Sequence, residues 1–134
     1  MLSVAGYDYF APISSNTAKQ QTNLLIEDDK GKILSSIKFS FMFPAPGLVI
    51  TPKNFKTVRM ADSAYADLLE KEYKFCKKNE QAIRTKAMKV YQIGCNPEHA
   101  LHKHCCDFHL LETKQDEWIA AQSIVAGKAQ ETKA

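Results

Sequence analysis

All four cysteines and all four histidines of this 134-residue chain lie between residues 61 and 127. Cysteine pairs form disulfides, and mixed sets of cysteine and histidine bind zinc. Catalysis by a cysteine would need a thiol in a recognisable turn beside a histidine and an orienting acid, which we do not find. We therefore predict no catalytic residue, and no cofactor unless the alternative zinc site forms. The disulfide candidates are Cys76, Cys95, Cys105 and Cys106, and the candidate metal ligands are His99, His102, Cys106 and His109.

Two long amphipathic helices are expected to position these side chains, over residues 62–93 and 97–125. In both, apolar residues recur at spacings of three, four or seven, which places them on one helical face. Gly94 suits a left-handed cap at the end of the first helix. Asn96 and Pro97 suit the first positions of the second. The short connection predicts an antiparallel helical hairpin.

Strand-like patterning precedes the helices, in residues 22–43. A short apolar run is followed by a turn signal at 28–31, and apolar residues then alternate with polar ones, as in a half-buried strand. We expect a β-hairpin here, after an extended N-terminal segment. An isolated hairpin is marginal in water, so its aromatic face must lie on the helices or on another protein. The residues predicted to contact a partner are Phe39, Phe41, Phe43 and Trp118.

The length favours one domain over 1–134, and the two long helices predict that it is mostly α. Its predicted parts are an arm with the β-hairpin (1–60), the helical hairpin (61–127) and a frayed tail (128–134). No apolar run approaches the roughly 20 residues needed to cross a bilayer. Residues 71–89 hold seven Lys or Arg against two Glu, which usually marks a solvated helix face. We therefore predict no nucleic-acid partner.

The cysteine spacing suggests a family. Cys95 and Cys105 form a C-x9-C pair, and Cys76 stands where a preceding pair would begin, although its partner position is Lys86. The chain thus resembles the mitochondrial twin C-x9-C proteins of the coiled-coil-helix-coiled-coil-helix type, such as the PDSW-type accessory subunit of respiratory complex I. The resemblance implies a disulfide between Cys76 and Cys105, and a location on the intermembrane-space side of the inner membrane.

Helical geometry leaves the state of these cysteines open. A helix beginning at Pro97 would separate Cys95 from Cys105 by about 15 Å of rise, too far for a disulfide. Cys76 would reach Cys105 or Cys106 only if the first helix ended early. The alternatives are that the cysteines pack as small apolar residues, or that some of them join histidines around zinc.

These features predict a non-catalytic structural or accessory subunit of a large assembly, which the resemblance implies to be a respiratory-chain complex. A Phe-rich hairpin, Pro-rich extended segments and a long helical pair suit an element draped over protein partners. Such a subunit would associate with a membrane complex without spanning the bilayer. The alternative is a small α+β binding or regulatory domain with a His/Cys zinc site.

Overall fold

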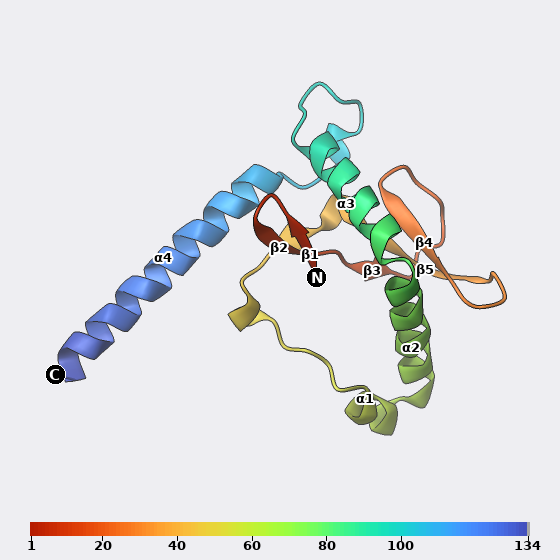
Figure 1. Cartoon of the computed structure of the whole chain (residues 1–134), viewed down its shortest axis with the longest axis horizontal. Coiled ribbons are helices and arrows are strands. Elements are labelled where there is room, and N and C mark those ends of the chain that lie inside the picture. Colours follow the sequence, from red (N-terminus) through yellow and green to blue (C-terminus); the bar gives the residue numbers. More distant parts are fainter. Residues whose placement is uncertain (134) are drawn as a thin grey trace.

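The computed structural model describes residues 1–133, and Ala134 lies outside the described part. The fold is α+β, so the prediction of a mostly α chain is wrong. Two antiparallel three-stranded sheets pack with helices (Figure 1). The difference arises mainly at the N-terminus, where segments predicted to be extended arm form strands that pair with distant residues.

The first sheet contains most of this unexpected structure. Strands β1 (Leu2–Val4) and β2 (Tyr7–Phe10) form a hairpin, and β2 also pairs with β6 (Phe43–Pro44), giving the order β1-β2-β6. The β1–β2 turn has φ of 52° at Ala5 and 83° at Gly6. Positive φ at both central residues suits the twist of a two-residue hairpin turn.

The second sheet confirms part of the predicted hairpin. Its strands are β3 (Ile13–Ser14), β4 (Asn23–Glu27) and β5 (Ile33–Lys38), in the order β3-β5-β4. The second hairpin strand ends earlier than predicted, because Phe39–Phe41 forms the 3₁₀ helix η1. This turn buries Phe39 and exposes Phe41, although strict alternation would place both on one face.

The first predicted helix is present but divided. Helices α2 (Ser63–Lys78) and α3 (Glu80–Gly94) meet at Asn79, whose side-chain amide donates to the Phe75 carbonyl at 2.8 Å. Asp62 caps α2, accepting from the Tyr65 N–H at 3.0 Å. Two shorter elements precede them, the 3₁₀ helix η2 (Gly47–Val49) and helix α1 (Phe55–Ala61).

The second predicted helix is wrong in its first part. Residues 96–105 form successive turns, including the 3₁₀ helix η3 (His102–His104), and Cys105 is extended. The Cys106 N–H donates to the Ser40 carbonyl at 2.9 Å, a tertiary bond that a continuous helix could not make. Helix α4 (Phe108–Lys133) begins only after Asp107. It includes residues 128–133, which were predicted to belong to a frayed tail.

Helices α3 and α4 do not form the predicted hairpin. Figure 1 shows α4 leading away from the rest of the fold, while α3 lies against the strands. Phe108, at the start of α4, is fully buried and stacks on Tyr91 with ring centroids 5.5 Å apart. Among the residues of α4 whose burial is described, 108–124, only Phe108 and Glu112 near its start are buried. None of the helices within the described part is long and apolar enough to cross a membrane.

Candidate functional site

The cysteine candidates lie in two places. Cys76 is on α2, whereas Cys95, Cys105 and Cys106 surround the end of α3, and all four are free thiols that pack against the core. Because residues 96–105 form turns and not an α-helix, the predicted helical separation of Cys95 from Cys105 does not apply. Burial raises the pKa of all four thiols. A raised pKa keeps a thiol protonated, and so weakly nucleophilic, at neutral pH.

Thiol counting tests the predicted disulfide. From the structure we expect four reactive thiols per chain in denaturant with a chelator and without reductant. The reagent is 5,5′-dithiobis(2-nitrobenzoic acid), and the count is repeated after reduction. Two thiols rising to four would restore the predicted disulfide instead.

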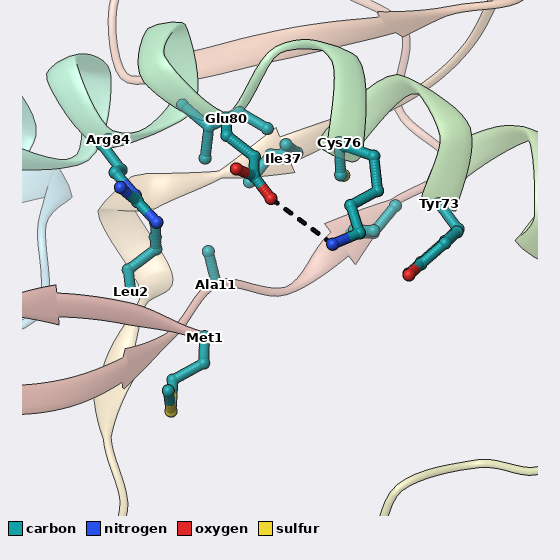
Figure 2. Close-up of a pocket in the computed structure, with 11 residues that line it drawn as sticks. Met1, Leu2, Ala11, Ile37, Tyr73, Cys76, Glu80 and Arg84 are labelled. Atoms are coloured by element: carbon teal, nitrogen blue, oxygen red, sulfur yellow. Dashed lines mark ion pairs between the residues drawn. The ribbon is translucent and has the colours of Figure 1, made fainter.

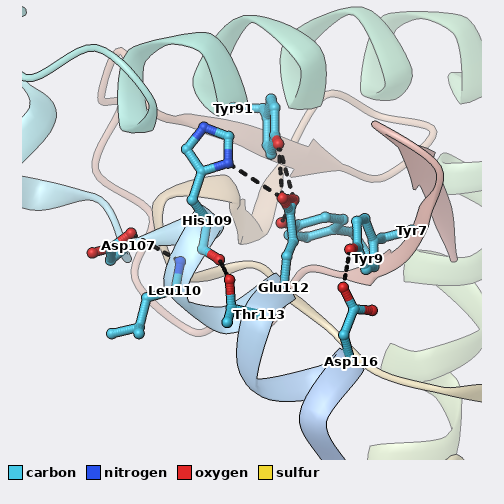
Figure 3. Close-up of polar contacts among 9 residues, drawn as sticks. All are labelled: Tyr7, Tyr9, Tyr91, Asp107, His109, Leu110, Glu112, Thr113 and Asp116. Carbon is cyan, nitrogen blue, oxygen red and sulfur yellow. Dashed lines mark hydrogen bonds and ion pairs between the residues drawn. The ribbon is translucent and has the colours of Figure 1, made fainter. Parts of the chain in front are cut away.

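The histidine candidates do not converge. The His99 Nδ1 accepts from the Leu101 N–H at 3.1 Å, and the His102 Nδ1 lies 3.4 Å from the Ile93 carbonyl. His109 points to Glu112 (Figure 3). Within the described residues, no three His, Cys, Asp or Glu side chains are grouped so that they could hold a metal ion.

The predicted partner-contact residues also separate. Phe39 is fully buried in the core and offers nothing to a partner. Phe41, Phe43 and Trp118 are between about a third and a half exposed. Phe41 borders a pocket that also contains polar and basic groups.

Glu112 has a buried carboxylate that accepts hydrogen bonds from two different elements of the fold (Figure 3). Glu112 of α4 is 7% exposed, and it accepts from Tyr9 of β2 at 2.7 Å and from Tyr91 of α3 at 2.9 Å. One turn further along α4, Asp116 accepts from the Tyr7 hydroxyl at 2.6 Å. These bonds join α4 to the first sheet and to α3. In the sequence, this network corresponds to two acids four residues apart, Glu112 and Asp116, and to two tyrosines two residues apart, Tyr7 and Tyr9.

A pocket of about 430 Å³ combines the side chains best suited to chemistry. It opens where the segment before β4, the end of β5, η1 and η3 meet. Lys38 supplies a cation, His104 an imidazole ring with two nitrogen atoms, and Phe41 a ring that is 52% exposed. The remaining lining residues are Gln20, Gln21, Thr22, Ser40 and Leu101. We call this the Lys38 pocket.

Main-chain hydrogen bonds hold the walls of the Lys38 pocket together. The Phe39 N–H donates to the Thr22 carbonyl at 3.2 Å, and the bond from Cys106 to Ser40 ties η1 to the segment that carries His104. The Lys38 Nζ lies 5.7 Å from the centroid of the Phe41 ring. The sequence did not indicate this pocket, because its residues come from three distant segments with no shared motif.

Three further cations form a group that begins next to this pocket. Lys19 directly precedes the lining residue Gln20, and Lys86 of α3 lies near both Lys19 and Lys89. Partial burial and the nearby charges of Lys89 and Lys19 lower the pKa of Lys86. Among the described residues, none of the three has a carboxylate within 4.0 Å. Clustered cations beside an exposed aromatic ring are typical of sites that bind single-stranded nucleic acid.

Comparison with known proteins gives a consistent result. The chain is 30% identical over 124 residues to the endoribonuclease ToxN of Bacillus thuringiensis subsp. kurstaki, a match that covers 86% of this chain and 64% of that relative. The chain therefore spans slightly less than two thirds of this curated relative. A solved type III toxin, studied for its selective inhibition by a non-coding RNA pseudoknot, is 30% identical with a TM-score of 0.78, covering 87% of this chain and 74% of its own.

A more distant structure shows the same fold. AbiQ, a lactococcal anti-phage endoribonuclease, has a TM-score of 0.71 at 19% identity, and the match covers 89% of this chain and 76% of AbiQ. The predictions of an accessory subunit, a non-enzyme, a mitochondrial location and purely protein partners are therefore wrong. The C-x9-C spacing was coincidental, because residues 96–105 form turns and the 3₁₀ helix η3 and not the α-helix that this family would place there. The family model for the toxin ToxN of type III toxin–antitoxin systems matches residues 1–116, and the chain belongs to this family.

Proposed function

We propose that this chain is an RNA-cleaving toxin, and that the Lys38 pocket binds the RNA strand at the scissile phosphate. The family supports the reaction class, since a relative of 30% identity is named an endoribonuclease. The observation that carries the location is the meeting of Lys38, His104 and the exposed Phe41 ring in one pocket.

RNA carries its own nucleophile, which limits what the protein must supply. The 2′-hydroxyl oxygen attacks the adjacent phosphorus while the bond to the 5′-oxygen breaks. A base takes the 2′-hydroxyl proton, and an acid returns a proton to the leaving oxygen. In our proposal His104 carries one of these transfers, and Lys38 neutralises the charge that grows on the phosphate oxygens.

The neighbouring groups suit the rest of the strand. Phe41 offers a face on which a base can stack, a contact that tolerates many sequences. Lys19, Lys86 and Lys89 would bind flanking phosphates, so that binding weakens as salt rises. We further propose that an inhibitory folded RNA, as in the relative inhibited by a pseudoknot, competes with substrate for the same surface.

Removing the Lys38 cation should strongly reduce cleavage. We expect Lys38→Ala to lower kcat/KM for a labelled single-stranded RNA by about 100-fold, because a lost transition-state charge contact typically costs that much. The matched control is Lys53→Ala. Lys53 also lies over an aromatic ring, 5.4 Å from the Tyr65 centroid, but outside the pocket. The control should change the rate less than twofold.

Gel analysis of RNA products, with and without EDTA, provides the measurement. Equal loss in both variants would show that Lys38 has no special role. An intact wild-type protein that leaves RNA uncut under both conditions would contradict the proposed reaction. Loss of cleavage in EDTA that zinc restores would support the alternative zinc site instead.

A further inference from the structure

Two side-chain hydroxyls of the Lys38 pocket have no partner in the protein. Thr22 and Ser40 line this pocket and are only 8% and 6% exposed. The other buried serines are bonded internally, Ser35 to the Glu72 carboxylate and Ser36 to a main-chain carbonyl, both at 2.7 Å. Within the described part of the chain, neither the Thr22 nor the Ser40 hydroxyl makes such a hydrogen bond.

These two hydroxyls are not sealed in the core. Among the described residues, the one buried side-chain oxygen or nitrogen atom without a hydrogen-bond partner is Oε1 of Gln115. The hydroxyl oxygens of Thr22 and Ser40 therefore keep contact with solvent, although most of each side chain is buried. Both residues line the Lys38 pocket, so the pocket is where their hydroxyls meet solvent.

The main chain holds both hydroxyls close to the Lys38 ammonium. Thr22 directly precedes β4, and Ser40 follows two residues after Lys38, the last residue of β5. The Thr22 carbonyl accepts from the Phe39 N–H at 3.2 Å, and the Ser40 carbonyl accepts from the Cys106 N–H at 2.9 Å. Each residue is thus fixed through its backbone, which leaves its side-chain hydroxyl available to a ligand.

Two other cavities of the fold lack this combination of cation and hydroxyls. One, of about 380 Å³, has a mostly apolar lining, and its Lys77 lies 3.7 Å from Glu80 (Figure 2). The other, of about 530 Å³, has four lysines but also the carboxylates of Glu27, Asp28 and Asp29, which would repel a phosphate. Neither contains a serine or threonine among its described lining residues. The Lys38 pocket is therefore the better match for an anion whose oxygens accept hydrogen bonds.

We propose that the hydroxyls of Thr22 and Ser40 donate hydrogen bonds to a non-bridging oxygen of the scissile phosphate, beside the Lys38 ammonium. The inference rests on the proposed function and names further groups that hold the phosphate in that pocket. Each hydroxyl has one hydrogen to donate, and a phosphate oxygen supplies the acceptor that the protein does not. Negative charge on this oxygen grows as the 2′-oxygen attacks, so both hydrogen bonds strengthen in the transition state.

Removing either hydroxyl should slow cleavage without weakening the fold. Ser40→Ala and Thr22→Val should each lower kcat/KM for a labelled single-stranded RNA by about 10- to 100-fold, because a donor to the developing charge is lost. Thr22→Ser keeps the hydroxyl and should recover most of the rate. All three variants should melt at the wild-type temperature in circular dichroism, since neither hydroxyl has a protein partner.

Ser35→Ala is the matched control. Ser35 is also a buried serine, but its hydroxyl is bonded to Glu72 and it does not line the Lys38 pocket. The control should lower the melting temperature, because a buried hydrogen bond is lost. It should change kcat/KM by less than about twofold.

Sulfur substitution tests whether the hydroxyls touch the phosphate. The probe is a labelled oligonucleotide with one ribose at the mapped cleavage position and one non-bridging oxygen of the next phosphate replaced by sulfur. Sulfur accepts hydrogen bonds more weakly than oxygen, so the wild type should cleave one diastereomer more slowly than the other. This difference should shrink in Ser40→Ala and Thr22→Val, because the bond that sulfur weakens is already absent. Ser35→Ala and Thr22→Ser should retain it.

The outcomes distinguish this inference from the proposed function. If Lys38→Ala slows cleavage while both hydroxyl variants cleave like the wild type, the Lys38 pocket stands and the inference is overturned. It is also overturned if the hydroxyl variants are slow but keep the full difference between diastereomers, or if the wild type cleaves both diastereomers equally. An intact wild type that leaves RNA uncut would contradict the proposed reaction, and the inference would fall with it.

Discussion

Replacing Glu112 by alanine should lower the free energy of unfolding by roughly 3–5 kcal/mol. The Glu112 carboxylate accepts hydrogen bonds from Tyr9 and Tyr91, and both phenols would lose their acceptor. Tyr9 is fully buried, so its hydroxyl could not turn to water without rearrangement. The loss should also release the start of α4 from β2 and α3, since this carboxylate joins all three.

Urea denaturation followed by circular dichroism measures the effect. His109→Ala is the control, because His109 is exposed, lies 3.4 Å from the same carboxylate and packs edge-on against Tyr91, so it loses these contacts without removing the acceptor of the two phenols. An exposed contact of this kind is worth less than about 1 kcal/mol. If Glu112→Ala cost no more than this control, the carboxylate would not anchor α4.

The same network predicts how stability changes at high pH. Burial, and then the hydrogen bond to Glu112, raise the pKa of Tyr9 and of Tyr91 above the usual tyrosine value. The unfolded chain releases these protons near pH 10 while the folded chain retains them, so stability should fall as pH rises above about 10. The fall should be smaller in Glu112→Ala, because the variant has lost the hydrogen bonds that favour the protonated phenols.

Local sequence signals were sufficient for elements whose contacts are local. The cap at Asp62, the apolar periodicity of α3 and the β4–β5 turn all depend on neighbours within a few residues. The Asp28 side chain, for example, accepts from the N–H groups of Lys30 and Lys32, both at 2.9 Å. Such contacts form whatever the rest of the chain does.

The errors arose where distant residues decide the structure. Asn96 and Pro97 are good helix starts, yet the Asn96 side chain instead accepts from the Glu98 N–H in a turn. The backbone bond between Cys106 and Ser40 then holds an extended segment that no local pattern indicates. The Lys38 pocket depends on this same segment. Its chemistry could therefore be seen only after the chain was folded.

Gly94 illustrates a residue whose role the sequence suggested for the wrong reason. It ends α3 as predicted, but it is not among the glycines with positive φ, which in the described chain are Gly6 and Gly31. What requires glycine is space. A β-carbon added at Gly94 would overlap the Phe108 ring and would lie 3.3 Å from the Cys105 Cβ.

Gly94→Ala should therefore destabilise the protein by about 3 kcal/mol, at the upper end of typical overpacking costs. Phe108 cannot move aside easily, because it is fully buried and also packs edge-on against Tyr9 at 5.9 Å. Gly47→Ala is the matched control, since a β-carbon there meets nothing within 4 Å and φ is not positive.

A double-mutant cycle separates overpacking from other effects of the Gly94 substitution. Phe108→Leu leaves room beside the new methyl group, so Gly94→Ala should cost at least 1 kcal/mol less in that background than in the wild type. Thermal and urea unfolding of the four proteins in the cycle supply the free energies. An equal cost in both backgrounds would mean that the methyl group does not meet the Phe108 ring, and that the tight approach of α4 to the end of α3 is not what requires glycine.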